Sequence, residues 1–322
     1  MFRFCCVITI VLSLSCTEAD RRSASTDLPA VAVMPSATPI DSRPSEPEYA
    51  AYPEKTIDEV FPVTTFSSSL DDDGREEDQS IDIAGYTMRI KNYVPHTLLK
   101  DGKVEFVFKK REPEGYWGTV VGVSHLRGPK SEDIYVAISG PGGVCCTNYS
   151  IIDISSGTPK SIFHSEDFGY FRNPMEVFDA DGDGVYELVQ FDSCMRYFLD
   201  DCGSCSPEPR VHFRYDRVQG QYLPAALIQQ AFVRESMASI EKWIDHEFKK
   251  WKSTRDLQTR YELDRSLRSY VADLLHIGAE QKAWAVFKRY GDDSDGKERK
   301  EIKRRLAGCK FYQALRQRYI AR

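Results

Sequence analysis

The sequence lacks any apolar run long enough to cross a bilayer as a permanent helix, which needs about 18 to 20 consecutive apolar residues. Its longest run of this kind, Phe4 to Leu14, is too short for that role. The sequence also lacks the Gly-x-x-x-x-Gly-Lys phosphate loop, the Gly-x-Ser-x-Gly elbow of serine hydrolases and the His-Glu-x-x-His pair of zinc proteases. These absences exclude a helical span after the N-terminal segment and leave several large enzyme classes without a motif.

Residues 1–16 have the pattern of a signal peptide, because Arg3 precedes the short apolar run. The run ends in Leu12-Ser13-Leu14-Ser15-Cys16, which resembles the lipobox of bacterial lipoproteins, although Ser13 stands where that family usually has Leu. The resemblance implies that Cys16 is lipidated after cleavage and anchors an exported protein to a membrane of the cell envelope, on its periplasmic or surface side. The alternative is ordinary cleavage near Ala19, which would leave a soluble exported protein.

Residues 17–80 have the composition of a flexible tether. They contain seven of the sixteen prolines, the serine run Ser67 to Ser69 and the acidic run Asp71 to Asp73, with 15 acidic residues against 5 basic ones. A segment of this kind buries too little apolar surface to offset the entropy lost on ordering. We therefore expect disorder over 17–80.

Residues 81–224 change to short β-branched and aromatic runs separated by Gly, Pro and Asp, a pattern typical of an all-β domain. This length fits a sandwich or a partial propeller-like array of sheets. The expected strands are Tyr86–Val94, Val104–Lys109, Trp117–Val123, Ile134–Ser139, Tyr149–Ile154, Ser161–His164, Met175–Phe178, Glu187–Phe191 and Val211–Tyr215.

Residues 225–322 have helical periodicity instead. Apolar residues recur every three or four positions, for example at Ile240, Ile244 and Phe248, and again at Leu267, Val271 and Leu274. The segment is basic, because residues 231–322 hold 22 basic and 14 acidic residues. The sequence therefore predicts an α+β protein with segregated domains, in which an all-β domain precedes an all-α helical bundle.

One acidic segment has the spacing of a calcium loop. It places acidic side chains at loop positions one, three, five and nine, with Gly184 at position six to permit a sharp turn. Calcium accepts six to eight oxygen ligands in loose geometry, which suits such a curled chain. The predicted ligands are Asp179, Asp181, Asp183, Glu187 and the carbonyl of Val185. The alternative is an acidic turn that holds no metal.

The flanks of this loop distinguish it from an EF-hand, which would have Glu at position twelve where this chain has Gln190. The residues on both sides look like strands. The segment Met175 to Phe191 therefore resembles the Asp-rich loop of FG-GAP or integrin-type repeats, and this resemblance implies a structural calcium ion between two strands. Such repeats normally come several to a propeller, whereas this chain has one.

The cysteines predict disulfides, because an exported chain meets an oxidising environment. Six candidates remain after Cys16 and the signal peptide are set aside, and six cysteines allow 15 pairings. They are Cys145, Cys146, Cys194, Cys202, Cys205 and Cys309. Because five of these lie in the β-rich segment, either one stays free or Cys309 bridges from the helical segment. The spacing of Cys202 and Cys205 also fits a redox motif or a metal knuckle, but the prolines that follow favour a loop.

Together these patterns predict an exported, membrane-anchored lipoprotein that acts as a binding or scaffold module stabilised by calcium and disulfides. Its ligand would be a protein or a glycan, and the compartment argues against nucleic acid. The alternative function is an envelope glycan hydrolase, because a protein with 49 acidic residues can hide a catalytic carboxylate pair. The basic C-terminal segment also fits an electrostatic contact with anionic lipids.

Overall fold

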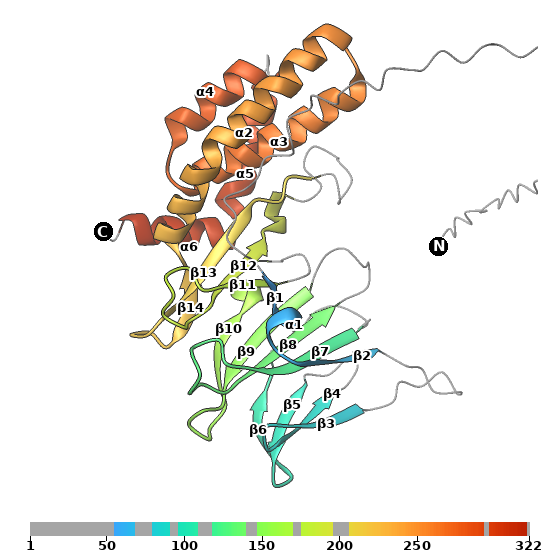
Figure 1. Cartoon of the computed structure of the whole chain (residues 1–322), viewed down its shortest axis with the longest axis vertical. Coiled ribbons are helices and arrows are strands. Elements are labelled where there is room, and N and C mark those ends of the chain that lie inside the picture. The colour runs from blue at the N-terminus through green and yellow to red at the C-terminus, as the bar shows by residue number, and fades with distance from the viewer. Residues whose placement is uncertain are drawn as a thin grey trace, which may run out of the picture. The chain divides into compact units, whose positions relative to one another are not determined.

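The computed structural model describes most of the chain after residue 54 (Figure 1). The described ranges are 55–67, 79–90, 96–108, 118–139, 147–169, 175–195, 206–292 and 296–320. The predicted signal peptide, Cys16 and residues 17–54 of the predicted tether lie outside them. None of the described helices is both long enough and apolar enough to span a membrane.

The described residues form three antiparallel sheets, each containing four strands in chain order. Sheet 1 consists of β3 (Gln79–Ile83), β4 (Tyr86–Ile90), β5 (Thr97–Lys100) and β6 (Lys103–Val107). Sheet 2 consists of β7 (Gly118–Ser124), β8 (Asp133–Ser139), β9 (Thr147–Asp153) and β10 (Lys160–His164), with β2 (Val63–Ser67) added beside β7. Sheet 3 consists of β11 (Glu176–Phe178), β12 (Glu187–Phe191), β13 (Arg210–Asp216) and β14 (Gln221–Pro224), with β1 (Lys55–Thr56) beside β11.

Sheet 2 is the middle layer because both of its faces are buried. Along β8, Ile134 and Val136 pack in an apolar cluster with sheet 1. Tyr135 and Ala137, which point to the opposite face, pack in a second cluster with sheet 3. A strand buried on both faces has apolar side chains at consecutive positions, which explains the continuous run Ile-Tyr-Val-Ala-Ile in β8.

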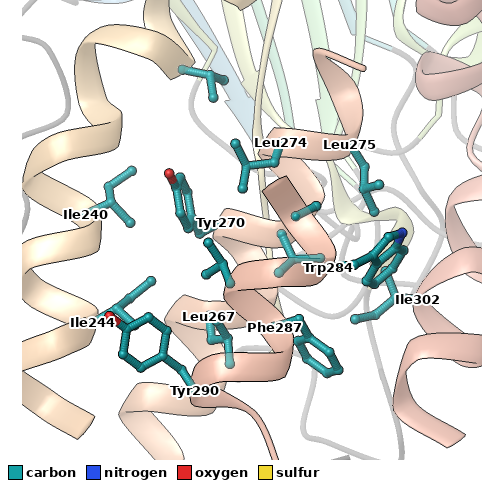
Figure 2. Close-up of a cluster of buried hydrophobic side chains, with 14 of the residues drawn as sticks. Ile240, Ile244, Leu267, Tyr270, Leu274, Leu275, Trp284, Phe287, Tyr290 and Ile302 are labelled. Atoms are coloured by element: carbon teal, nitrogen blue, oxygen red, sulfur yellow. The ribbon is translucent and has the colours of Figure 1, made fainter. Parts of the chain in front are cut away.

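The helices follow the sheets without interruption by strands, as the sequence predicted. They are α2 (Ala226–Thr254), α3 (Leu257–His276), α4 (Glu280–Tyr290), α5 (Lys297–Gly308) and α6 (Lys310–Ile320). Residues from α2, α3, α4 and α5 share one apolar core, in which Ile240 and Ile244 lie opposite Leu267 and Tyr270 (Figure 2). The prediction of an α+β protein, with the sheets in the first part of the chain and the long helices segregated in the C-terminal part, is therefore confirmed.

The helical region contacts sheet 3. Gln229 of α2 accepts hydrogen bonds from the backbone N–H of His212, at 3.1 Å, and pairs with its ring Nδ1 at 2.7 Å. Phe311 of α6 packs edge-on against Phe213 of β13, with ring centroids 5.2 Å apart. Since His212 and Phe213 are neighbours on β13, their side chains point to opposite faces of sheet 3. Helices therefore cover parts of both faces of this sheet.

The tether prediction is wrong for residues 55–67. These residues form β1, the short helix α1 (Ile57–Val60) and β2, and they pair with sheets 3 and 2. Ile57 is only 3% exposed and belongs to the cluster between those two sheets. The elements are too short to show a periodic pattern, and Pro53 and Pro62 beside them made the segment look like the rest of the tether. Burial of Ile57 and pairing with sheet edges supply the order that local composition does not.

Candidate metal centre

The predicted calcium loop connects two paired strands of sheet 3. β11 and β12 are antiparallel, and Phe178 lies opposite Glu187 in their register. Residues 179–186 therefore form a hairpin connection whose two ends are held together by the strands. Phe178 and Leu188 are buried and fix these ends in the core. The strand–loop–strand arrangement expected from the flanking residues is confirmed.

The side-chain carboxylate of Asp179 shapes the loop by accepting hydrogen bonds from the backbone N–H groups of other loop residues. One carboxylate oxygen, Oδ1, accepts the N–H groups of Gly182 at 2.8 Å and Asp183 at 3.1 Å. The other, Oδ2, accepts the N–H of Gly184 at 2.9 Å. Gly182 and Gly184 have φ angles of 72° and 78°, a left-handed conformation that glycine adopts without strain. The loop is therefore curled around the Asp179 carboxylate.

This curl brings together three of the predicted ligands. Asp179, Asp181 and Asp183 each place one carboxylate oxygen within 4.8 Å of the other two. Calcium binds oxygens at about 2.3 to 2.6 Å, so two oxygens on opposite sides of one ion are about 5 Å apart. The spacing of the three oxygens fits a single ion of this size, and all three are the hard ligands that calcium prefers.

Glu187 lies outside that group of three oxygens. Glu187 is fully buried, and its Oε2 accepts the backbone N–H of Ala180 at 2.8 Å. Burial raises the pKa of Glu187 to about 7, although the Ala180 N–H and the charge of Arg214 oppose this rise. Val185 is also buried, and its N–H donates to Asp183 Oδ1 at 2.8 Å.

Two arginines of the neighbouring hairpin face the acidic loop, and sequence reasoning missed both. Arg214 of β13 places Nη2 2.5 Å from Asp181 Oδ2 and 3.7 Å from Asp183 Oδ2, and its Nε lies 3.4 Å from Glu187 Oε1. Arg217, beyond the end of β13, lies 3.2 Å from Asp183 Oδ2. The Arg214 hydrogen bond is the main cause of the lowered pKa of Asp181. The loop charge is therefore partly neutralised from within the protein.

The far side of the loop is tied to sheet 2. Tyr186 donates its N–H at 2.8 Å to the carbonyl of Leu126, which lies in the connection between β7 and β8. The hydroxyl of Tyr222, on β14 of sheet 3, lies 3.4 Å from the same carbonyl and 3.1 Å from the carbonyl of Tyr186. Next to Leu126, Arg127 donates to Asp133 at 2.6 and 2.9 Å and to Asp153 at 2.9 Å. These contacts join the loop to the middle sheet through groups that are mostly buried.

A cavity of about 560 Å³ is lined in part by Arg214, the residue that also contacts the acidic loop. Its lining comes from β13, β14, the start of α2 and one residue of α6, and it is mainly apolar. The apolar lining residues are Leu223, Pro224, Ala225, Ala226, Leu227 and Ile228. Leu227 is 60% exposed.

A second polar arrangement lies on sheet 2. Ser150 and His164 are partners on β9 and β10, with Ser150 Oγ 2.9 Å from His164 Nδ1, and His164 Nε2 lies 3.5 Å from Glu166 Oε2. The residue types are those of a catalytic triad. However, Ser150 and His164 are 5% and 7% exposed, and neither lines any of the three cavities described for this part of the chain. We assign this arrangement a structural role, because a nucleophile needs access to its substrate.

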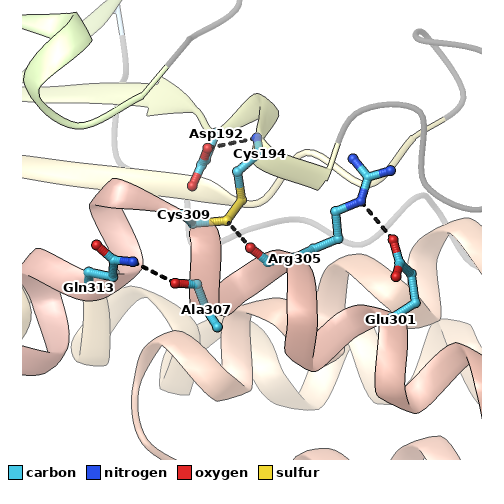
Figure 3. The surroundings of a disulfide bond; sticks show 7 residues. All are labelled: Asp192, Cys194, Glu301, Arg305, Ala307, Cys309 and Gln313. Atoms are coloured by element: carbon cyan, nitrogen blue, oxygen red, sulfur yellow. Dashed lines mark hydrogen bonds and ion pairs between the residues drawn. A yellow bond between two sulfur atoms is a disulfide. The ribbon is translucent and has the colours of Figure 1, made fainter.

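The structure joins Cys194 and Cys309 in a disulfide across 115 residues of sequence (Figure 3). Cys194 lies in the short 3-10 helix η2 (Ser193–Met195) after β12, and Cys309 lies between α5 and α6. The sequence left two alternatives open for Cys309, and the structure shows the one in which it bridges to the β-rich segment. The other candidates, Cys145, Cys146, Cys202 and Cys205, lie outside the described residues.

Asp192 lies beside this bridge, and its Oδ1 accepts the N–H of Cys194 at 2.9 Å. Burial raises the pKa of Asp192 to about 7. The carboxylate and the two sulfur atoms lie within 4.8 Å of one another. The sulfurs are bonded to each other and carry no thiolate charge, so the group is not a metal site in this state.

No protein-family model, curated protein or solved structure matches this chain. The interpretation of the loop therefore depends on its own residues and geometry.

Proposed function

We propose that this protein is an exported envelope lipoprotein whose β-rich region binds a partner and is stabilised by one calcium ion. The observation that carries this proposal is the convergence of three carboxylates in one hairpin loop. The loop is kept curled by hydrogen bonds from its backbone N–H groups to the Asp179 carboxylate. Oxygen ligands at this spacing suit calcium better than a softer metal, which would prefer Cys or His.

The ion would be held by Asp179, Asp181 and Asp183, with Glu187 and the Val185 carbonyl as further ligands. When bound, it supplies a positive charge that cross-links the loop between β11 and β12. Because Tyr186 of the loop donates its N–H to Leu126, in the connection between β7 and β8, a bound ion would stabilise the contact between sheets 3 and 2. Extracellular modules bind calcium with dissociation constants of about 10⁻⁴ to 10⁻³ M, which suits a structural ion in an exported protein.

The sheet arrangement supports a partial propeller-like interpretation more than a two-sheet sandwich. Three successive four-stranded antiparallel sheets, packed face against face, have the strand order of propeller blades. An Asp-rich loop between two adjacent strands of one sheet is also where FG-GAP-type repeats carry theirs. The helices, which share one core, would act as a small bundle that covers sheet 3.

The apolar cavity beside Arg214 is the best candidate for the ligand site. Its lining is mostly aliphatic, with Tyr215 as the aromatic contribution among the described lining residues, and it carries one arginine. Glycan sites depend on aromatic rings and many polar groups, whereas an aliphatic pocket favours apolar side chains of a protein segment. We therefore propose a protein ligand.

Hydrolysis of envelope glycans receives less support from the cavities. A glycosidase needs two carboxyl groups about 5 to 9 Å apart in one cleft. Each of the three cavities has a single acidic residue among its described lining residues, namely Asp216, Glu280 or Glu166. These cavities therefore favour binding over this chemistry.

Calorimetric titration of the full-length protein with calcium, followed by thermal melts, tests the proposal. We expect binding and a rise in melting temperature for the wild type, and neither for an Asp181→Asn, Asp183→Asn variant. A control variant, Glu105→Gln with Asp292→Asn, removes two exposed charges elsewhere and should behave as the wild type does. If the loop variant binds calcium as well as the control does, the loop is not the site.

The lipid anchor has its own test. Cells expressing the wild type should incorporate a labelled fatty acid into the protein and retain it in the membrane fraction. A Cys16→Ala variant should lose both the label and the membrane association. Retention of the label by this variant would refute lipidation at Cys16.

A further inference from the structure

Arg214 occupies a special place relative to the acidic loop. Its guanidinium contacts three of the four acidic residues that the calcium proposal uses, at 2.5, 3.7 and 3.4 Å from Asp181, Asp183 and Glu187. Asp181 and Asp183 belong to the group whose oxygens converge. One side chain from β13 therefore pairs with two of the three carboxylates that would hold a calcium ion.

A guanidinium and a calcium ion cannot share these oxygens at full strength. A carboxylate whose charge is already paired with a guanidinium attracts a calcium ion less strongly than an unpaired one. Two cations within about 4 to 5 Å also repel each other strongly where the surroundings are partly buried. Calcium binding therefore requires the guanidinium to leave, at least from Asp181.

The structure gives the displaced side chain somewhere to go. Arg214 is 43% exposed and lines the cavity of about 560 Å³, so its guanidinium can move toward solvent without displacing the core. The long, flexible arginine side chain needs only rotations about its own bonds for such a move. Its backbone stays fixed because Arg214 pairs with Leu223 in sheet 3.

We propose that Arg214 is a built-in counter-cation that calcium must displace, and that this competition sets the calcium affinity of the loop. The inference rests on the proposed calcium site and adds its regulation. In the ion-free state the guanidinium neutralises the loop, and in the ion-bound state it moves to the cavity. Calcium occupancy thereby changes the charge at the edge of the proposed ligand site.

Arg217 provides a matched control. It lies three residues further along the same hairpin and carries the same charge, but it is 72% exposed, and Asp183, at 3.2 Å, is the one acidic partner found for it among the described residues. Removing either arginine makes the neighbourhood of the loop more negative by one unit. Both variants therefore attract calcium more strongly through the added negative charge. A larger gain in calcium affinity for Arg214→Gln than for Arg217→Gln would show that calcium must displace the Arg214 guanidinium from the converging carboxylates.

The experiment is calorimetric titration of calcium into the full-length wild type, Arg214→Gln, Arg217→Gln and the Asp181→Asn, Asp183→Asn variant. Ion pairs at the surface are individually weak, but Arg214 pairs with Asp181 and Asp183 there and also with the buried Glu187. We therefore expect Arg214→Gln to bind calcium about tenfold more tightly than the wild type. Arg217→Gln should change the affinity by about threefold or less. Circular dichroism spectra that match the wild type establish that each variant is folded.

The outcomes separate the inference from the calcium proposal. Equal affinity changes in the two arginine variants, or no gain in Arg214→Gln, would overturn the displacement mechanism while leaving the calcium site intact. Binding by Arg214→Gln alone would support the mechanism, because the wild-type guanidinium would then outcompete calcium. If no variant binds at about 10 mM calcium, well above the affinity range of extracellular modules, both the site and its regulation are refuted.

Discussion

The Cys194–Cys309 disulfide makes a quantitative prediction about stability. We expect a Cys194→Ala, Cys309→Ala double variant to fold and to be markedly less stable than the wild type. A double variant is preferable to chemical reduction, because reduction would also reach the cysteines outside the described residues. It is preferable to a single variant, because a single variant would leave one unpaired thiol free to form a wrong bridge.

The magnitude follows from the length of the loop that the bridge closes. A cross-link between residues 115 positions apart restricts the unfolded chain. Chain-entropy arguments give about 5 kcal/mol for a loop of this length, and native disulfides typically contribute about 2 to 5 kcal/mol because residual structure in the unfolded chain reduces the effect. A loss of this size should lower the melting temperature by on the order of 10 °C.

The assay uses two probes that report different parts of the chain. Three of the four tryptophans, Trp243, Trp251 and Trp284, lie in α2 and α4, so tryptophan fluorescence follows mainly the helical region. Circular dichroism follows helices and sheets together. In the wild type the two transitions should coincide, whereas in the double variant the fluorescence transition should come first, because the bridge no longer holds the α5–α6 junction to η2.

Two results would refute this reasoning. The first is a free energy of unfolding within about 1 kcal/mol of the wild type, which is less than any loop-closure account allows. The second is the absence of a Cys194–Cys309 peptide when the unreduced protein is digested and analysed by mass spectrometry. If the first result is obtained and the bridged peptide is also found, the bridge forms but the unfolded chain is already compact, so that closing the loop restricts it little.

Two further predictions concern buried charge. Arg127→Ala should destabilise the protein by about 3 kcal/mol or more in urea unfolding, because it leaves the fully buried Asp133 without its oppositely charged partner. Arg217 is exposed, so Arg217→Ala should cost less than about 0.5 kcal/mol. Similar costs for the two variants would contradict this account. Burial lowers the pKa of His212 and His276 to about 4, so the unfolded chain takes up their protons as the pH falls below about 6.5 while the folded chain does not. The stability that each histidine contributes above pH 6.5 is thus lost as the pH falls toward 4. Between pH 7 and 4.5 the free energy of unfolding of the wild type should fall by about 2 to 3 kcal/mol relative to that of a His276→Leu variant. Parallel pH profiles of the two proteins would refute the lowered pKa of His276.

The opposite shift at Asp192 explains why the histidine test compares two proteins. Burial raises the pKa of Asp192 to about 7, so its contribution to stability is complete below about pH 4 and is lost as the pH rises toward 7. This change runs against that of the histidines and would partly hide it in the wild type alone. The difference between the wild type and His276→Leu cancels it, provided that the two sites do not interact.

Local patterns predicted the elements that local physics controls. The strand Glu187–Phe191 agrees with the prediction at both ends, and α3 buries Leu267, Val271 and Leu274, whose spacing predicted it. Within the β-rich region the strands β3, β5 and β14 were missed. β3 begins at Gln79, inside the predicted tether, while β5 and β14 have four residues each, too few for alternation to be visible. β14 also ends in Pro224, a residue that normally argues against a strand.

What the sequence alone determined is the chemistry carried by neighbouring residues. The acidic loop is such a case, because Asp179, Asp181 and Asp183 are close in the chain and two glycines permit the turn that makes their oxygens converge. The change from strand to helix near Pro224 is another, since periods of about two and 3.6 residues are written into the order of side chains.

Only the tertiary structure decided which distant residues meet. Arg214 lies 33 positions from Asp181, and Cys309 lies 115 positions from Cys194. No local pattern distinguishes these partners from the other arginines, or this bridge from the other pairings of six cysteines. The contacts arise because sheet 3 places β13 beside β12, while burial of Phe311 against β13 brings the α5–α6 junction near the end of β12. Long-range pairing depends on how the whole apolar surface is buried, and that is a property of the fold and not of any segment.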